Sequence, residues 1–164
     1  MSDALPGSAG AWVVRVRLVA VPFALLEVAI EHGNYPPGYE RWAWATTAVL
    51  AGAAILSIFA GGRLLPLVVD TLVVSAYVCL YSFEPSSPVR ELMFLPVAEA
   101  ALLFGTRAGV LWPALSVPAL WFFERQTSHE LGEPYDLGHL LGPLGLQVLA
   151  GVVVARLAWS RCEG

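Results

Sequence analysis

The sequence predicts an all-α, polytopic membrane protein with six transmembrane helices and both termini in the cytoplasm. Two observations carry the fold class. Of the 164 residues, 57% are hydrophobic and only 13% are charged, whereas about 25% are charged in an ordinary soluble domain. The mean hydropathy is +0.68, and the apolar residues gather in six stretches long enough for membrane helices. We therefore expect a single transmembrane domain whose solvent is lipid.

The six stretches define the expected helices, because a transmembrane helix needs about 20 mostly apolar residues. They cover residues 11–31, 41–60, 64–82, 88–104, 108–123 and 137–160. Helix breakers follow the first five in turn: Gly33 with Pro36 and Pro37, then Gly61 and Gly62, Pro85, Gly105, and finally Gly132 with Pro134. Strands are excluded because the runs are too continuous for the alternating pattern of an outer-membrane barrel.

Arginine placement sets the predicted orientation, because cytoplasmic loops of membrane proteins retain positive charge. With both termini inside, six arginines fall on the cytoplasmic side: Arg15, Arg17, Arg63, Arg107, Arg156 and Arg161. Only Arg41, Arg90 and Arg125 fall outside. Most acidic residues take the external side, so the outer face is expected to be acidic.

Several function classes are excluded at this level. The net charge is −4 and no basic run exists, so nucleic acid is not an expected partner. Cys79 and Cys162 form no pair with metal-ligand spacing, and we expect neither a disulfide nor a zinc site. No catalytic or phosphate-binding motif is present, so we predict no enzymatic activity and no cofactor.

Three acidic residues lie within the predicted spans, where an ionisable group is costly and often functional. Asp70 falls at a depth similar to that of Arg17, so the two could form a structural ion pair or belong to an ion or ligand path. Glu99 is near the midplane at the depth of Gln147, to which it could be hydrogen bonded, and Pro96 one turn earlier predicts a helix kink. The third, Glu27, lies near the external end of its helix.

Acidic and histidine side chains gather on the predicted outer face. Glu27 and Glu31 share one helix face, followed by His32. The last external connection and the helix after it carry a second group: His129, Glu130, Glu133, Asp136 and His139. Imidazole and carboxylate together suit a divalent metal or a pH-sensitive switch. The spacing matches no specific metal motif, so the identity of any metal is open, and the alternative is an ordinary solvated loop.

Small residues predict close helix packing. Gly151 and Ala155, and likewise Ala48 and Gly52, are spaced by four residues, which lets helix backbones approach. Packing within one chain is the expectation, and packing between two copies in a homodimer is the alternative.

The stretch from Glu91 to Arg161 contains ELMFLPVAEAALLFGTRAG, an aromatic helix with an acidic end, and the closing helix LLGPLGLQVLAGVVVARLAWSR. It resembles the N-terminal multi-helix membrane region of bacterial, especially actinobacterial, sensor histidine kinases and related signalling proteins. The resemblance implies that the last helix leads into a cytoplasmic output domain. The sequence contains neither a phosphoacceptor histidine segment nor an ATP-binding domain. It therefore corresponds to an isolated input domain or to a free-standing membrane protein.

Together these features predict a sensory or ligand-binding module of the bacterial inner membrane. Its stimulus is expected near Glu27, Glu31, His32, Glu133 or His139, with Glu99 and Gln147 as deeper binding candidates. The last helix would relay the change to a cytoplasmic signalling domain or protein. Two alternatives stand beside this: a substrate-binding membrane subunit of an importer, and a structural or assembly protein without a ligand.

Overall fold

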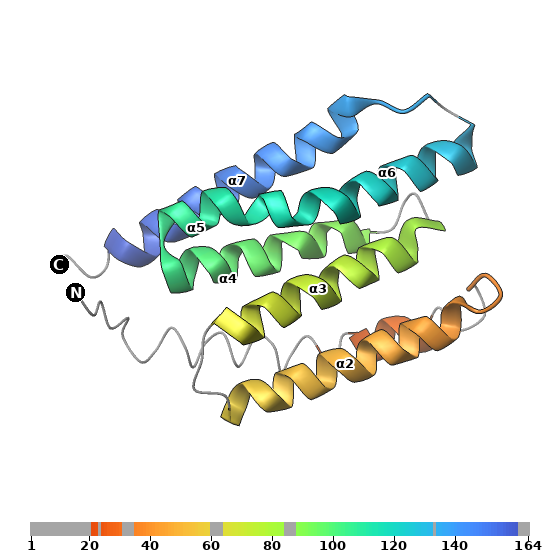
Figure 1. The fold of residues 1–164 in the computed structure, drawn as a ribbon, viewed down its shortest axis with the longest axis horizontal. Helices are drawn as coiled ribbons and strands as arrows, with labels where there is room; N and C mark the ends of the chain where they lie inside the picture. The colour runs from red at the N-terminus through yellow and green to blue at the C-terminus, as the bar shows by residue number, and fades with distance from the viewer. Residues whose placement is uncertain are drawn as a thin grey trace. The chain divides into compact units, whose positions relative to one another are not determined.

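A computed structural model describes residues 21–22, 24–30, 35–59, 64–83, 88–132 and 134–160. Every regular element in these residues is helical, which confirms the all-α prediction for this part of the chain. The chain divides into two compact units, Met1–Val73 and Val74–Gly164. Each unit is described by itself, with the elements labelled in Figure 1.

The first unit contains a helical segment over residues 21–22 and 24–30, the helix α2 (Tyr39–Phe59), and the beginning of α3 (Leu64–Leu80). A turn starts α2, in which the Tyr39 amide donates to the Pro36 carbonyl at 3.0 Å. Side chains spaced by three or four residues are buried along α2: Ala43, Thr47, Leu50 and Ala54. Large apolar side chains are exposed elsewhere on the same helix, including Trp42, Val49 and Leu56. A helix that is apolar all round is typical of a membrane span or of a buried core.

The second unit begins within α3 and continues through the short 3₁₀ helix η2 (Tyr81–Phe83). Five further elements follow before the last helix: η3 (Pro88–Met93), α4 (Phe94–Phe104), α5 (Thr106–Leu111), η4 (Trp112–Ser116) and α6 (Val117–Leu131). The last helix, α7, runs over Leu137–Ser160. Figure 1 shows α5, η4 and α6 following one another as one long helical run that turns back beside α4. The core of this unit is formed where α4, α5 and α7 pack together.

Glycines allow a tight turn and a close helix contact in this core. Gly105 alone separates α4 from α5 and has φ 81° and ψ −168°, a conformation that is essentially limited to glycine. Gly109 in α5 lies against Gly151 in α7, so that a Cβ on Gly109 would meet the Gly151 carbonyl oxygen at 2.8 Å. Gly151 and Ala155 are both buried, and the Gly151 contact lies within this chain, as predicted.

The helix boundaries follow the predicted ones, with two differences. The helix predicted over 108–123 continues to Leu131, because polar helix formers such as Gln126 extend it to a stop at Gly132, which is left-handed with φ 66°. His129 and Glu130 are therefore helical rather than part of a loop. The second difference is that the α-helical part of the stretch predicted over 88–104 begins only at Phe94, so Pro96 lies in the first turn of α4, where proline is tolerated.

Two of the described helices are long and apolar enough to cross a membrane, Leu64–Phe83 and Leu137–Ala158. Their mean hydropathies are 2.0 and 1.8. Of the predicted span over residues 11–31, only 21–22 and 24–30 belong to the described residues, and these are helical.

Candidate functional site

A buried carboxylate joins three segments of the second unit that are distant in sequence. The Glu124 side chain in α6 is only 7% exposed, and its Oε1 lies 3.5 Å from Nη1 of Arg90 in η3. Its Oε2 lies 3.9 Å from Nδ1 of His139 in α7. We call Arg90, Glu124 and His139 the ionic cluster. Because an unpaired buried charge is costly, a carboxylate in this position depends on its cationic neighbours.

The helical run from Thr106 to Glu124 is long enough to cover the thickness of a bilayer's hydrocarbon core. The 18 steps comprise α-helical residues and the five residues of η4, which together span about 30 Å. The hydrocarbon core of a bilayer is about 30 Å thick. If the turn at Gly105 lies at one face of the bilayer, Glu124 therefore lies at the other.

Local hydrogen bonds hold the elements around the ionic cluster. At the start of α7, Asp136 Oδ1 accepts from the Gly138 amide at 2.8 Å, and the Asp136 carbonyl accepts from the His139 amide at 3.2 Å. These bonds place His139 in the first turn of α7. On α6, the Arg125 guanidinium lies 5.2 Å from the ring centre of Trp121, a cation–π contact.

The ionic cluster remains open to the surroundings on its cationic side. The His139 side chain is 67% exposed and that of Arg90 is 39% exposed. Arg90 Nε also lies 3.5 Å from Oε1 of Glu91, whose side chain is 55% exposed. A proton or a charged ligand can thus reach His139 and Arg90 directly, whereas Glu124 is shielded. His139 is charged only when it is protonated, so its attraction to Glu124 depends on its protonation state.

A second polar contact lies deeper between the same helices. Ser116 in η4 and Gln147 in α7 are both buried, and Ser116 Oγ lies 2.7 Å from Gln147 Oε1. Ser116 Oγ also lies 2.6 Å from the Pro113 carbonyl oxygen. Gln147 Nε2 is buried without a hydrogen-bond partner among the described residues. The sequence suggested Glu99 as the partner of Gln147, and the structure gives it Ser116 instead.

The predicted site residues are distributed unevenly over the described part of the chain. Glu31, His32, Glu133 and Arg17 lie outside the described residues. Asp70 is buried in α3, while Glu27 and Glu99 are half-buried in helices. Because Arg17 is not described, the predicted Asp70–Arg17 ion pair stays a prediction. His139 contacts Glu124 of α6 and Gln147 contacts Ser116 of η4, so both candidates have a polar partner from another helix.

Sequence reasoning missed the partners of these two residues. Glu124 directly follows the stretch predicted over 108–123, so from the sequence it falls among the external acidic residues. Its spacing carried a usable signal, because Leu120, Phe123 and Glu124 occupy one helix face and all three are buried. The contact of Ser116 with Gln147 carries no sequence signal, since nothing in a single sequence pairs residues that are 31 positions apart.

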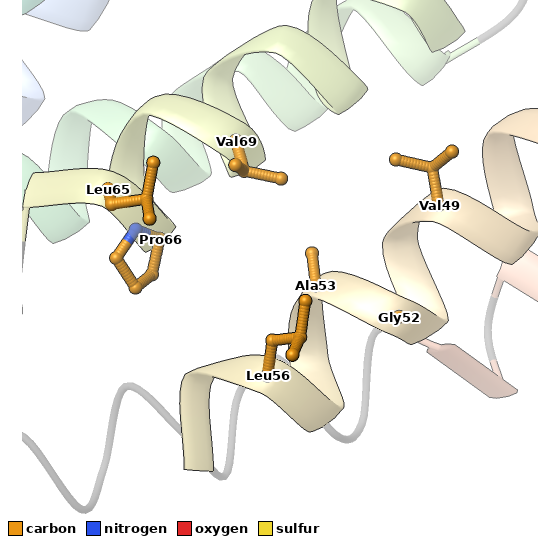
Figure 2. A pocket seen from close by; sticks show the side chains of 7 residues that line it. All are labelled: Val49, Gly52, Ala53, Leu56, Leu65, Pro66 and Val69. Carbon is orange, nitrogen blue, oxygen red and sulfur yellow. The ribbon is translucent and has the colours of Figure 1, made fainter. Parts of the chain in front are cut away.

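A cavity of about 230 Å³ lies in the first unit between α2 and α3. Figure 2 shows the residues that line it, which are all apolar: Val49, Gly52, Ala53, Leu56, Leu65, Pro66 and Val69. Asp70 is not among them. A pocket for a polar or ionic solute needs polar groups that fix the ligand, so this cavity does not support an importer subunit for such solutes.

The chemistry available to the described residues is therefore ion pairing and hydrogen bonding between helices. Within that part of the chain, no three His, Cys, Asp or Glu side chains come together as they would to hold a metal ion. The ionic cluster offers one imidazole, one guanidinium and one shielded carboxylate, which suits recognition of charge. The chain matches no family model, no curated protein and no solved structure.

Proposed function

We propose that this chain is a multi-pass sensory module of the bacterial inner membrane, with both termini cytoplasmic, in which the ionic cluster reads charge or pH outside. The observation that carries the proposal is Glu124, a buried carboxylate placed between Arg90 and His139. A stimulus that changes the charge on His139, or that competes for Arg90, alters the ionic contacts of Glu124, and these contacts join η3, α6 and α7.

The membrane part of the proposal is supported by α3 and α7, which are long and apolar enough to span a bilayer. Large apolar side chains are exposed along α7 from its start to its end: Leu137, Leu141, Leu146, Leu149, Val153 and Leu157. In water such a continuous apolar surface would be a strong aggregation liability. In lipid it is the expected surface of a spanning helix.

The relay follows from the length of α7. From His139 to Ser160 the helix is continuous and covers about 32 Å, so a shift at its first turn is carried toward the cytoplasmic end. In the proposed mechanism two packings of α6 and α7 are in equilibrium, and protonation of His139 favours the one with the shorter His139–Glu124 pair. The output changes only as far as the stimulus distinguishes the two packings.

The test uses the full chain in lipid nanodiscs. Cys79 is replaced by alanine, so that an environment-sensitive fluorophore can be attached to Cys162 alone. The fluorophore signal is recorded while the pH is changed from about 8 to about 5, the range in which histidine titrates. We expect a sigmoidal response in the parent chain and its loss in Glu124→Gln, which keeps the side-chain size and removes the charge.

Glu91→Gln is the matched control, because it removes an exposed carboxylate that also contacts Arg90 but joins no third element. It should retain the response. The proposal fails if Glu124→Gln responds as the parent does, or if the response disappears equally in Glu91→Gln. Uptake of a labelled solute into sealed vesicles containing the parent chain would favour the importer reading, since a sensor moves no solute.

A further inference from the structure

Two helical runs that face each other both contain proline at corresponding depth. The run from α5 to α6 is interrupted by the 3₁₀ helix η4, which contains Pro113, and Pro118 follows in the first turn of α6. In the opposite helix, Pro143 lies inside α7 one turn before Gln147. A 3₁₀ stretch in the middle of a helix often marks a hinge, and Pro143 inside α7 lacks the N–H that would close an intrahelical hydrogen bond.

The Ser116 hydroxyl in η4 cannot donate to both of the acceptors that lie near it. Ser116 has one hydroxyl hydrogen, yet two acceptors lie within reach, the Pro113 carbonyl at 2.6 Å and Gln147 Oε1 at 2.7 Å. Rotating the Gln147 amide by 180° solves this, because oxygen and nitrogen exchange places. Nε2 then donates to Ser116 Oγ, and the hydroxyl donates to the Pro113 carbonyl. The amide thus reaches the carbonyl of the proline in η4 through one serine.

About 13 Å from Ser116 along η4 and α5, at Gly109, the two runs are in backbone contact. Pro113 has no N–H, so it cannot donate to the carbonyl of Gly109 four residues earlier. That carbonyl instead lies against Gly151, where any Cβ would overlap it. The contact leaves no room for α5 and α7 to move closer, and it fixes one end of the interface. Beyond η4, α6 packs much less extensively on α7 than α4 and α5 do.

From these observations we infer that η4 is a hinge and that the Ser116–Gln147 hydrogen bond holds this hinge in one position. While the bond is made, α6 is held to α7 at the depth of η4. When it is broken, α6 swings about η4 while the Gly109–Gly151 contact stays in place. This inference deepens the proposed function, since the swing would move Glu124 relative to His139, but it can be tested without any stimulus.

The experiment measures two distances by double electron–electron resonance in nanodiscs. Cys79 and Cys162 are replaced by alanine, so that only the introduced cysteines are labelled. One nitroxide pair, His129→Cys with Leu141→Cys, reports the separation of the outer ends of α6 and α7. The other pair, Leu111→Cys with Val153→Cys, reports the glycine crossing. All four positions are exposed on their helices.

Gln147→Leu removes the hydrogen bond and replaces the amide with an apolar group of similar size. A tilt of about 10° at η4 would move position 129, about 20 Å away, by about 3 Å. We therefore expect the outer distance to lengthen or broaden by about that amount and the crossing distance to stay unchanged. Ser116→Ala should give the same result, and the double variant should add nothing further, because both changes break one bond.

Ser82→Ala is the matched control, since Ser82 is also fully buried but its hydroxyl donates to Cys79 in its own segment. It should leave both distances unchanged. Unaltered outer distances in folded Gln147→Leu or Ser116→Ala would overturn the hinge, and so would an equal lengthening at both label pairs. If Gln147→Leu fails to fold, Ser116→Ala decides the question. If the parent chain gives no pH response but the two label distances change as expected, only the proposed function is refuted.

Discussion

The crossing of α5 and α7 should not accept a single additional carbon atom. In Gly151→Ala the new Cβ would overlap the Gly109 carbonyl oxygen and lie 2.8 Å from its carbon and 2.9 Å from Gly109 Cα. All three atoms are backbone, so no side-chain rotation can relieve the overlap. The two helices must separate by about 1 Å to restore ordinary contact distances, and a gap of about that size forfeits a quarter to a half of the attraction between facing atoms.

We expect Gly151→Ala to lower the free energy of unfolding by about 1–3 kcal/mol, the usual cost of overpacking a close-packed interior. Alanine favours the helix over glycine by about 1 kcal/mol, so the effect of the clash is partly masked. Gly145→Ala in the same helix separates the two terms, because nothing lies within 4 Å of its missing Cβ. This control should be neutral or slightly more stable than the parent.

The assay is reversible unfolding in mixed detergent micelles, followed by helical circular dichroism. The difference in the free energy of unfolding between Gly151→Ala and Gly145→Ala gives the cost of the clash. Gly109→Ala should behave like Gly151→Ala, and the double variant should cost less than the sum, because the first separation makes room for the second methyl group. Equal stabilities for Gly151→Ala and Gly145→Ala would refute the argument for a backbone contact at this crossing.

Three further predictions concern the second unit, each measured by the same unfolding assay. Phe123→Ala removes an aromatic ring that is 1% exposed and should cost about 3–5 kcal/mol, while Phe122→Ala, at an exposed ring, should cost much less. Gly132→Ala places a Cβ on the left-handed residue that ends α6 and should cost about 1–2 kcal/mol, partly recovered by Gly132→Asn; full stability would contradict the cap. Gly105→Ala should cost about 1–3 kcal/mol because φ 81° with ψ −168° suits glycine alone, and an unchanged midpoint would show that the turn can rearrange.

Apolar run length was the strongest guide to the fold. It placed α7 over the residues that the structure gives, 137–160, because long apolar runs between breakers have few alternatives to helix. It failed at the end of α6, since hydropathy falls at Glu124 while helical hydrogen bonding continues to Leu131. Hydropathy reports the surroundings of a segment, whereas helix termination depends on local stops such as Gly132.

The site was less predictable than the fold for a physical reason. His139 and Gln147 were recognised by residue type and depth, but their partners Glu124 and Ser116 depend on which helices are neighbours. Helix adjacency is a tertiary property, and amphipathic patterning gives little information about it when lipid replaces water outside. The 3₁₀ geometry of η4 was hidden as well, because prolines at 113 and 118 are compatible with a kinked helix and with a 3₁₀ turn.

The one-residue connection at Gly105 joins α4 and α5 so tightly that neither can enter a bilayer long before the other. In the proposed topology the two helices would leave the insertion machinery as one antiparallel hairpin, its closed end bonded through the Gly105 amide to Ala101 at 2.9 Å and through the Gly105 carbonyl to Gly109 at 3.1 Å. The backbone groups at the turn would thus be satisfied before α7 arrives. Assembly of the core would then be the docking of a late single helix onto a finished pair.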